Sequence, residues 1–177
     1  DEEIHVQLAG LLFQRRRFAE SVQVYQHAIR AEPGNGDLYN ELAYACAYAG
    51  DLAAGARSIG EYEKLNPQSA NPQDTLGEIY FLSGKFAPAE KAFLAAYGKD
   101  PAFLGGAELR KAAMARLLAG DAAGANGLFQ RFTDAASRHP LVEVYKAQWL
   151  YIQGRKKEAM EALGHSKLPL SEAQLAA

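Results

Sequence analysis

The residues that could carry metal or redox chemistry lie far apart along the 177-residue sequence. No two of the four histidines have the spacing that lets one helix present two ligands to a metal ion. They are His5, His27, His139 and His165. The one cysteine, Cys46, falls in an apolar stretch, where a thiol is buried and inert, and it has no second cysteine for an internal disulfide. We therefore expect no metal site and no cofactor.

Side chains for nucleophilic or acid–base catalysis are equally sparse. Ser58 lies between glycines, but a nucleophile elbow has one residue on each side of its serine and follows a strand, and neither condition holds. Asp74 and Glu78 lie four residues apart, on one face of an expected helix. Like charges at that spacing on an open surface seldom have perturbed pKa values. We expect no catalytic residue, and we assign these two carboxylates to recognition.

Charge and hydropathy exclude two classes of partner. Lys and Arg number 19 against 21 Asp and Glu, a net charge of -2, so no overall field attracts a phosphate backbone. Apolar runs such as 42–49 end well short of the ~20 residues that a membrane span needs. The acidic first residues do not resemble a targeting peptide. We therefore expect no nucleic-acid partner and no membrane insertion. The expected location is the cytoplasm, with the periplasm and the cell exterior as alternatives.

A 34-residue period organises the chain. Pro33, Pro67 and Pro101 are each 34 residues apart, and the pairs Gly50/Gly84 and Gly120/Gly154 have the same spacing. Gly84 and Gly120 are 36 apart, which places a two-residue insertion near 102–106. Apolar residues recur within each unit at helical spacing. Each unit is therefore predicted to be two helices of roughly 13 residues joined by a tight turn.

The third unit allows the local signals to be interpreted residue by residue. Asn71 is expected to cap its first helix, with Pro72 at the first helical position and Asp74 as a capping carboxylate. The turn glycine ends that helix. A second helix is expected over 86–97, ended by Gly98 in a left-handed cap.

The third unit also carries a family signature, with seven residues at the spacing W-x2-L-G-x2-Y, A-x3-F, A, P. They are Leu76, Gly77, Tyr80, Ala89, Phe93, Ala96 and Pro101. The chain thus resembles the tetratricopeptide repeat family. The resemblance implies an all-α, right-handed α-solenoid of about five helix-turn-helix repeats in a single domain. The expected repeats cover 2–35, 36–69, 70–103, 106–139 and 140–165, followed by a short C-terminal helix, a cap or partial repeat, at 169–177.

In that family the first helix of each repeat lines a concave groove that binds a protein or peptide. Carried onto this sequence, the groove positions are Asn40, Tyr44, Tyr48, Asp74, Glu78, Phe81, Arg110, Met114, Gln148 and Tyr151. The clamp that one subfamily uses for acidic C-termini is absent, because its positions hold Val6, Gly10, Glu41, Asn71 and Thr75. Carboxylates beside aromatic rings favour a basic segment with an apolar anchor.

The leading hypothesis is therefore a non-catalytic scaffold for protein–protein interaction. Two alternatives remain open. In the first, the chain is a structural spacer or self-assembly module whose exposed ends stack. In the second, it is a docking region of a larger bacterial signalling protein. The second alternative comes from the stretch 70–80, which resembles tetratricopeptide regions of such proteins, some of which carry serine/threonine kinase domains.

Overall fold

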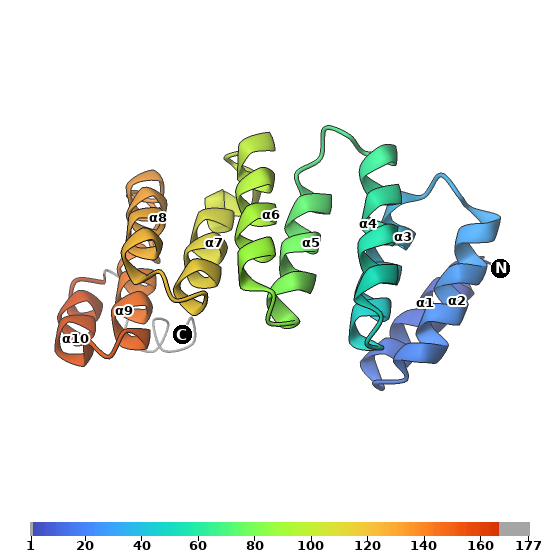
Figure 1. Ribbon diagram of the computed structural model, residues 1–177, viewed down its shortest axis with the longest axis horizontal. Coiled ribbons are helices and arrows are strands. Elements are labelled where there is room, and N and C mark those ends of the chain that lie inside the picture. Colours follow the sequence, from blue (N-terminus) through green and yellow to red (C-terminus); the bar gives the residue numbers. More distant parts are fainter. Residues whose placement is uncertain (1, 167–177) are drawn as a thin grey trace. The chain divides into compact units, whose positions relative to one another are not determined.

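The computed structural model describes residues 2–166, and all regular structure within that range is helical. The helices form successive pairs (Figure 1). Their bounds are α1 (Glu2–Gln14) and α2 (Phe18–Ala31), α3 (Gly36–Tyr48) and α4 (Leu52–Leu65), α5 (Asn71–Leu82) and α6 (Phe86–Lys99), α7 (Ala107–Leu118) and α8 (Ala122–Ala135), and α9 (Val142–Ile152) and α10 (Lys156–Gly164). The prediction of an all-α fold built from helix pairs is confirmed. No helix in the described range is both long enough and apolar enough to cross a membrane.

The turn within a pair explains the glycine period. Gly50, Gly84, Gly120 and Gly154 each have a positive φ, between 71° and 96°. Glycine reaches this left-handed region without the Cβ clash that other residues meet, so it ends a first helix and lets the chain reverse. The two inserted residues of the fourth unit lengthen the connection after α6, where η1 (Phe103–Gly106) forms a short 3₁₀ turn.

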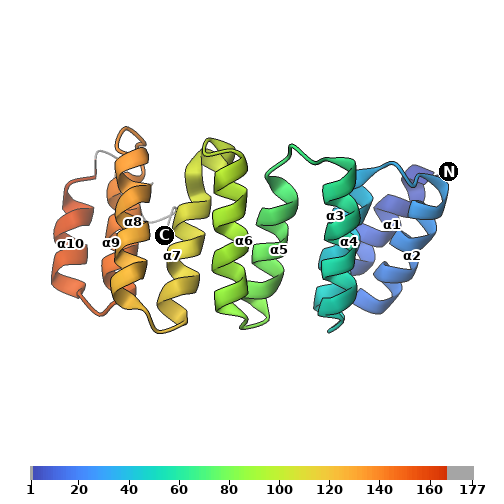
Figure 2. The ribbon, with the colours of Figure 1, turned by 45° about the horizontal axis from the view of Figure 1, so that its top comes forward.

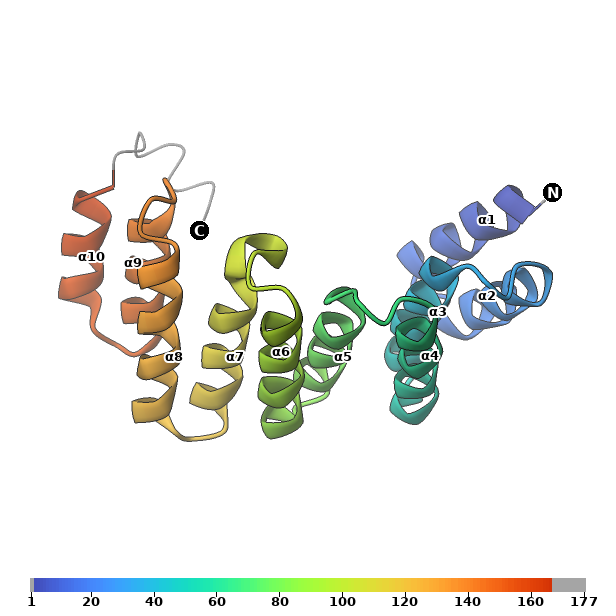
Figure 3. The ribbon, with the colours of Figure 1, turned by 90° about the horizontal axis from the view of Figure 1, so that it is seen from above.

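The first compact unit, Asp1–Leu128, is a stack of these pairs. The second helices α2, α4 and α6 each pack against their own first helix and against the first helix of the next pair. Figure 1 shows the second helices α2 and α4 in front of the first helices α1 and α3, and Figures 2 and 3 show α5, α6 and α7 lying side by side. The first helices α3, α5 and α7 therefore form one layer of the unit.

Equivalent residues fill the successive junctions. Tyr25 of α2 is buried against Leu38 and Leu42 of α3. Ile59, 34 residues after Tyr25, is buried against Ile79 of α5. Each pair thus buries its apolar face on the next, and this nearest-neighbour packing makes a stack of hairpins stable where one hairpin alone is not.

Small residues lie where two helices cross closely. A Cβ on Gly77 would come within 2.5 Å of the Phe93 ring, which is itself buried. Ala89, on the same second helix as Phe93, is fully buried. The family pattern of glycine and alanine at these positions therefore follows from the close approach of α5 and α6.

The second compact unit, Phe129–Ala177, is described up to Ser166. Its core is aromatic, since Phe129 stacks on Trp149 with ring centroids 4.5 Å apart and Phe132 meets Tyr145 edge-on at 5.6 Å. Helices α9 and α10 pack together as a pair. The C-terminal helix expected at 169–177 lies outside the described residues.

Three local predictions for the third unit are wrong. The Asp74 carboxylate bonds Lys111 of α7 and does not cap the start of α5. Asn71 does not cap α5 but is its first residue, after Ala70, and its side chain donates to the Tyr62 hydroxyl at 2.9 Å. The hydroxyl of Ser69 accepts from the Asn71 amide instead. Gly98 does not end α6, which continues to Lys99. In the last two cases the residue at the end of the helix is bonded to the preceding pair: Asn71 bonds Tyr62, and the Lys99 ammonium bonds the Glu63 carboxylate and the Pro67 carbonyl.

Candidate partner-binding site

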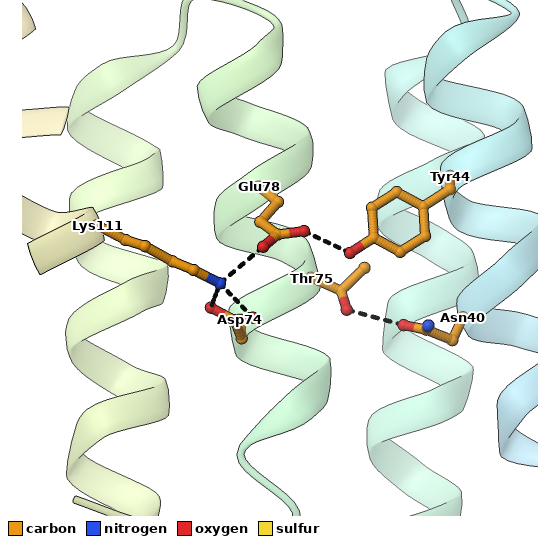
Figure 4. Close-up of polar contacts among 6 residues, drawn as sticks. All are labelled: Asn40, Tyr44, Asp74, Thr75, Glu78 and Lys111. Carbon is orange, nitrogen blue, oxygen red and sulfur yellow. Dashed lines mark hydrogen bonds and ion pairs between the residues drawn. The ribbon is translucent and has the colours of Figure 1, made fainter. Parts of the chain in front are cut away.

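A lysine bridges the two carboxylates that the sequence singled out. Asp74 and Glu78 are one turn apart on α5, and Lys111 reaches them from α7 (Figure 4). The lysine Nζ lies 2.8 Å from both Asp74 oxygens and 2.6 Å from Glu78 Oε1. One cation thus joins two neighbouring first helices through three charge-assisted hydrogen bonds, which are the stronger kind.

Burial differs across this ion cluster. The side chain of Asp74 is 5% exposed, that of Lys111 22% and that of Glu78 35%. Burial raises the pKa of Asp74, against the opposing effect of the lysine. Burial alone would lower the pKa of Lys111, but its bonds to the two carboxylates raise it above the usual value, so the lysine stays charged. The expectation that both carboxylates lie on an open surface is therefore wrong for Asp74.

Two more hydrogen bonds join α5 to α3. The Tyr44 hydroxyl donates to Glu78 at 2.5 Å, and the Thr75 hydroxyl donates to the side-chain oxygen of Asn40 at 2.8 Å (Figure 4). Burial, together with the Glu78 carboxylate, raises the pKa of Tyr44. Asn40 and Tyr44, both expected to face a partner, are thus half-buried and bonded to the next helix of the array.

A pocket of about 310 Å³ opens beside this cluster. Four of the expected groove residues line it together: Glu78, Phe81, Arg110 and Met114. The remaining lining residues are Leu82, Phe93 and Lys111, and the lysine Nζ lies 5.6 Å from the centre of the Phe93 ring. The pocket therefore combines an apolar lining of Phe, Leu and Met with charged side chains, an arrangement that suits one apolar side chain of a bound segment.

The other expected groove residues lie elsewhere. Tyr48 is exposed but packs against Phe13 and Phe18, with ring centroids 5.3 and 5.2 Å away. In the second unit, Gln148 is half-buried, and Tyr151 is exposed with the Lys156 Nζ 5.9 Å from its ring centre. None of these three lines the α5–α7 pocket.

Lys111 is the residue that the sequence analysis missed. It follows Arg110, the position nominated from the family pattern, by one residue. Its repeat position is that of Thr75 once the two inserted residues are counted, and Thr75 bonds Asn40, 35 residues earlier. Lys111 bonds Asp74, 37 residues earlier, which is the same offset plus the insertion. Complementary polar residues at this repeat offset are therefore the signal that could have identified it.

Two other pockets, of about 610 and 600 Å³, are copies of one another. Tyr39, Leu42, Cys46 and Arg57 line the first, and the residues 34 positions later, Gln73, Leu76, Tyr80 and Lys91, line the second. Because this groove recurs with the repeat, the stacking of hairpins explains it, and it does not indicate a specific binding site. We therefore take the α5–α7 pocket as the candidate site.

The described residues include no candidate site for metal or thiol chemistry. Within residues 2–166, no group of three or more His, Cys, Asp or Glu side chains is arranged to hold a metal ion. Cys46 is buried, and burial raises the pKa of its thiol, which disfavours the reactive thiolate.

The fold has counterparts among solved structures. No protein-family model and no curated protein matches the chain. Among solved structures, it resembles a tetratricopeptide repeat protein from Parabacteroides merdae over 99% of this chain and 72% of that one, with a TM-score of 0.67 and 14% identity. The chain has the tetratricopeptide-repeat fold.

Two further structures agree with this tetratricopeptide-repeat fold. PilF of Pseudomonas aeruginosa is 14% identical over 97% of this chain and 79% of that one, with a TM-score of 0.67. A crystal structure of MamA is 14% identical and covers 95% of both chains, with a TM-score of 0.64. At 14% identity, these three likenesses show the fold.

Proposed function

We propose that this protein is a non-catalytic scaffold that binds a peptide or protein segment along the layer formed by α3, α5 and α7. The observation that carries the proposal is the α5–α7 pocket, where four residues nominated independently from the sequence line one cavity. Its volume is at the lower limit for a small-ligand site, about 300 Å³, and matches a single large side chain better than a whole substrate.

The apolar lining should dominate affinity. Phe81, Phe93 and Met114 offer aromatic and polarisable surface, and Leu82 at the mouth is exposed. Burying one apolar side chain is worth about 1.5–3 kcal/mol, whereas an exposed ion pair contributes about 0–1 kcal/mol. The partner segment should therefore carry an aromatic or long aliphatic anchor.

Charge should set a weaker preference for a basic residue beside that anchor. Of the two carboxylates, Glu78 is exposed enough for a partner to approach, whereas Asp74 is buried beneath Lys111. The basic preference proposed from the sequence should therefore depend on Glu78 alone.

A display library of random peptides, selected on the full chain, tests the proposal. Phe81→Ala and Met114→Ala should each weaken the selected peptides about tenfold, or 1.4 kcal/mol. Leu118→Ala is the matched control, because Leu118 lies on the same helix as Met114, is half exposed and does not line the pocket. Failure to enrich any peptide, or equal affinities for all four proteins, would refute the proposal.

The charge preference has its own pair of variants. Glu78→Gln should reduce the selectivity for basic over acidic versions of a selected peptide. Asp74→Asn, a matched change one turn away, should leave that selectivity unchanged. If Asp74→Asn changes it and Glu78→Gln does not, the assignment of the reachable carboxylate is wrong.

A further inference from the structure

One carboxyl group in the first unit is buried without a partner. Glu108, the second residue of α7, is 0% exposed, and within the described residues neither of its carboxyl oxygens accepts a hydrogen bond. Burial of a carboxylate is costly unless the charge is paired and hydrogen-bonded. An ionised Glu108 therefore opposes the packing of α7 against its neighbours.

The repeat register shows that this position is apolar in the two preceding units. With the two inserted residues counted, Glu108 is equivalent to Pro72 of α5 and Leu38 of α3. Pro72 is fully buried, and Leu38 is buried in the cluster that contains Tyr25 and Ala28 of α2. Helices α6 and α7 lie side by side (Figure 2), and α6 packs on α7 as α2 packs on α3. Glu108 thus places a titratable group where the equivalent junctions hold an apolar residue.

The charged neighbours of Glu108 leave it without a cation. Lys111 is on the same helix, but its ammonium group has three N–H donors, and all three are used on Asp74 and Glu78. The other charged groups near Glu108 in the described part of the chain are acidic, namely Asp74 of α5 and Asp100, which follows α6, and η1 contributes no titratable side chain. Burial raises the pKa of Glu108 and the charge of Asp74 adds to the rise, while its own backbone amide and Lys111 oppose part of it. The packed junction therefore favours the protonated, neutral carboxyl.

The connection before α7 is strained, and the helix itself is short. Leu104 of η1 has a φ of 45°, in the left-handed region that residues with a side chain rarely adopt, and the two glycines after it have φ values of 65° and 77°. Helix α7 has 12 residues, and an isolated helix shorter than about 12–15 residues is marginal in water. Helix α7 therefore depends on packing against its neighbours to stay folded, and the α6–α7 junction is a point where local unfolding can start.

We propose that the α6–α7 junction is a pH-controlled opening point of the first unit: Glu108 is neutral while the junction is closed, and loss of its proton allows α7 to separate from α6. In the open state water surrounds the carboxyl, whose pKa returns to about 4.3. The closed state binds more protons, so closure is strongest in acid and weakens as the pH rises from about 4.3 through the raised pKa.

Opening of this junction also removes the α5–α7 pocket, because Arg110, Lys111 and Met114 line it from α7 and Phe93 lines it from α6. Low pH therefore keeps the pocket assembled. The opening itself does not depend on the proposed function, since it concerns the packing of α7 in the free chain.

Hydrogen exchange of the full chain at pH 5 and pH 8, measured by mass spectrometry, tests the proposal without any peptide. Expressing the result as protection factors removes the pH dependence of exchange in an unfolded chain. Protection of α7 relative to α3 should fall by about tenfold or more between the two pH values, because closure weakens by up to about tenfold per pH unit within the titration window. Helix α3 is the internal reference, since Leu38 holds the equivalent position there.

Two variants isolate the charge of Glu108. Glu108→Gln keeps the size of the side chain without its charge, so most of the fall in α7 protection should disappear. Glu108→Leu restores the residue type of Leu38 and should behave in the same way. Glu61→Gln, an exposed position on α4, is the matched control and should show the wild-type fall.

Three results would overturn the proposal. The first is an equal change of protection in α3 and α7 of the wild type. The second is a fall in both Glu108 variants as large as in the wild type. The third is failure of both variants to fold, because the proposal requires the closed junction to accept a neutral side chain at this position.

Discussion

Removing the charge of Lys111 tests the electrostatics of the candidate site most sharply. Lys111→Met keeps the length and apolar stem of the side chain, which lies near Phe93, but leaves Asp74 buried without its cation. Breaking a buried ion pair in this way costs about 3–5 kcal/mol. Since Lys111 and Glu78 are partly exposed, water can offset part of that cost, and we expect about 2–3 kcal/mol at pH 8.

The loss should depend on pH in a defined direction. Burial raises the pKa of Asp74, and removal of the lysine takes away the effect that opposes this rise. A carboxyl whose pKa is higher in the folded state binds more protons there, so stability falls as the pH rises through the window between the unfolded and folded pKa values. The Lys111→Met penalty should therefore be largest at pH 8 and shrink toward pH 4, near the ordinary pKa of aspartate, about 3.9.

Urea unfolding of the full chain, followed by far-UV circular dichroism at pH 8 and pH 4, measures this difference. Lys91→Met, an exposed lysine on α6, is the control and should cost about 0.5 kcal/mol or less. Adding Asp74→Asn to Lys111→Met should restore about 1–2 kcal/mol by removing the stranded charge. A Lys111→Met penalty no larger than the control, or one that is equal at both pH values, would refute the buried-charge argument.

Two further substitutions test packing and burial. Gly77→Ala should cost about 1–3 kcal/mol, because the new Cβ would meet the buried Phe93 ring. Gly60→Ala, inside α4 with open space around it, should instead stabilise the protein by about 0.5–1 kcal/mol. Urea unfolding of both variants measures the two effects, and equal effects would contradict the close crossing of α5 and α6. Glu108 is fully buried, neither of its carboxyl oxygens has a hydrogen-bond partner in the described range, and burial raises its pKa. Glu108→Leu should thus gain about 1–3 kcal/mol at pH 8 and less at pH 4, where the raised pKa keeps most of the folded-state carboxyl protonated. Thermal unfolding at the two pH values measures the gain, and a pH-independent gain would show that charge is not the cause.

The helix pairs could be predicted because the signals for their turns are local. A glycine such as Gly84 and a proline such as Pro101 restrict the backbone wherever they occur, and their 34-residue spacing reports the repeat directly. The residue at which a helix begins was less predictable. Asn71 is a good cap by type, yet its side chain bonds Tyr62 of the preceding pair, a partner that only the packed hairpins bring close.

The candidate site could be predicted in part for the same reason. Family positions placed Phe81, Arg110 and Met114 near one another, and they line one pocket. The pairing of Asp74 with Lys111 was missed because one residue along a helix rotates a side chain by about 100°, so adjacent residues face different neighbours. Burial of Asp74 depends on how closely α5 and α7 approach, and no local pattern in the sequence encodes that distance.

The central claim is that a partner segment binds along α3, α5 and α7 with an apolar side chain in the α5–α7 pocket. Chemical-shift mapping of the backbone amides, during titration of the full chain with a peptide selected on it, tests this most directly. We expect the largest shifts at Phe81, Leu82, Arg110 and Met114, with small shifts along α2 and α4. Shifts concentrated at Arg57 and Lys91, in the grooves that recur with the repeat, would contradict it.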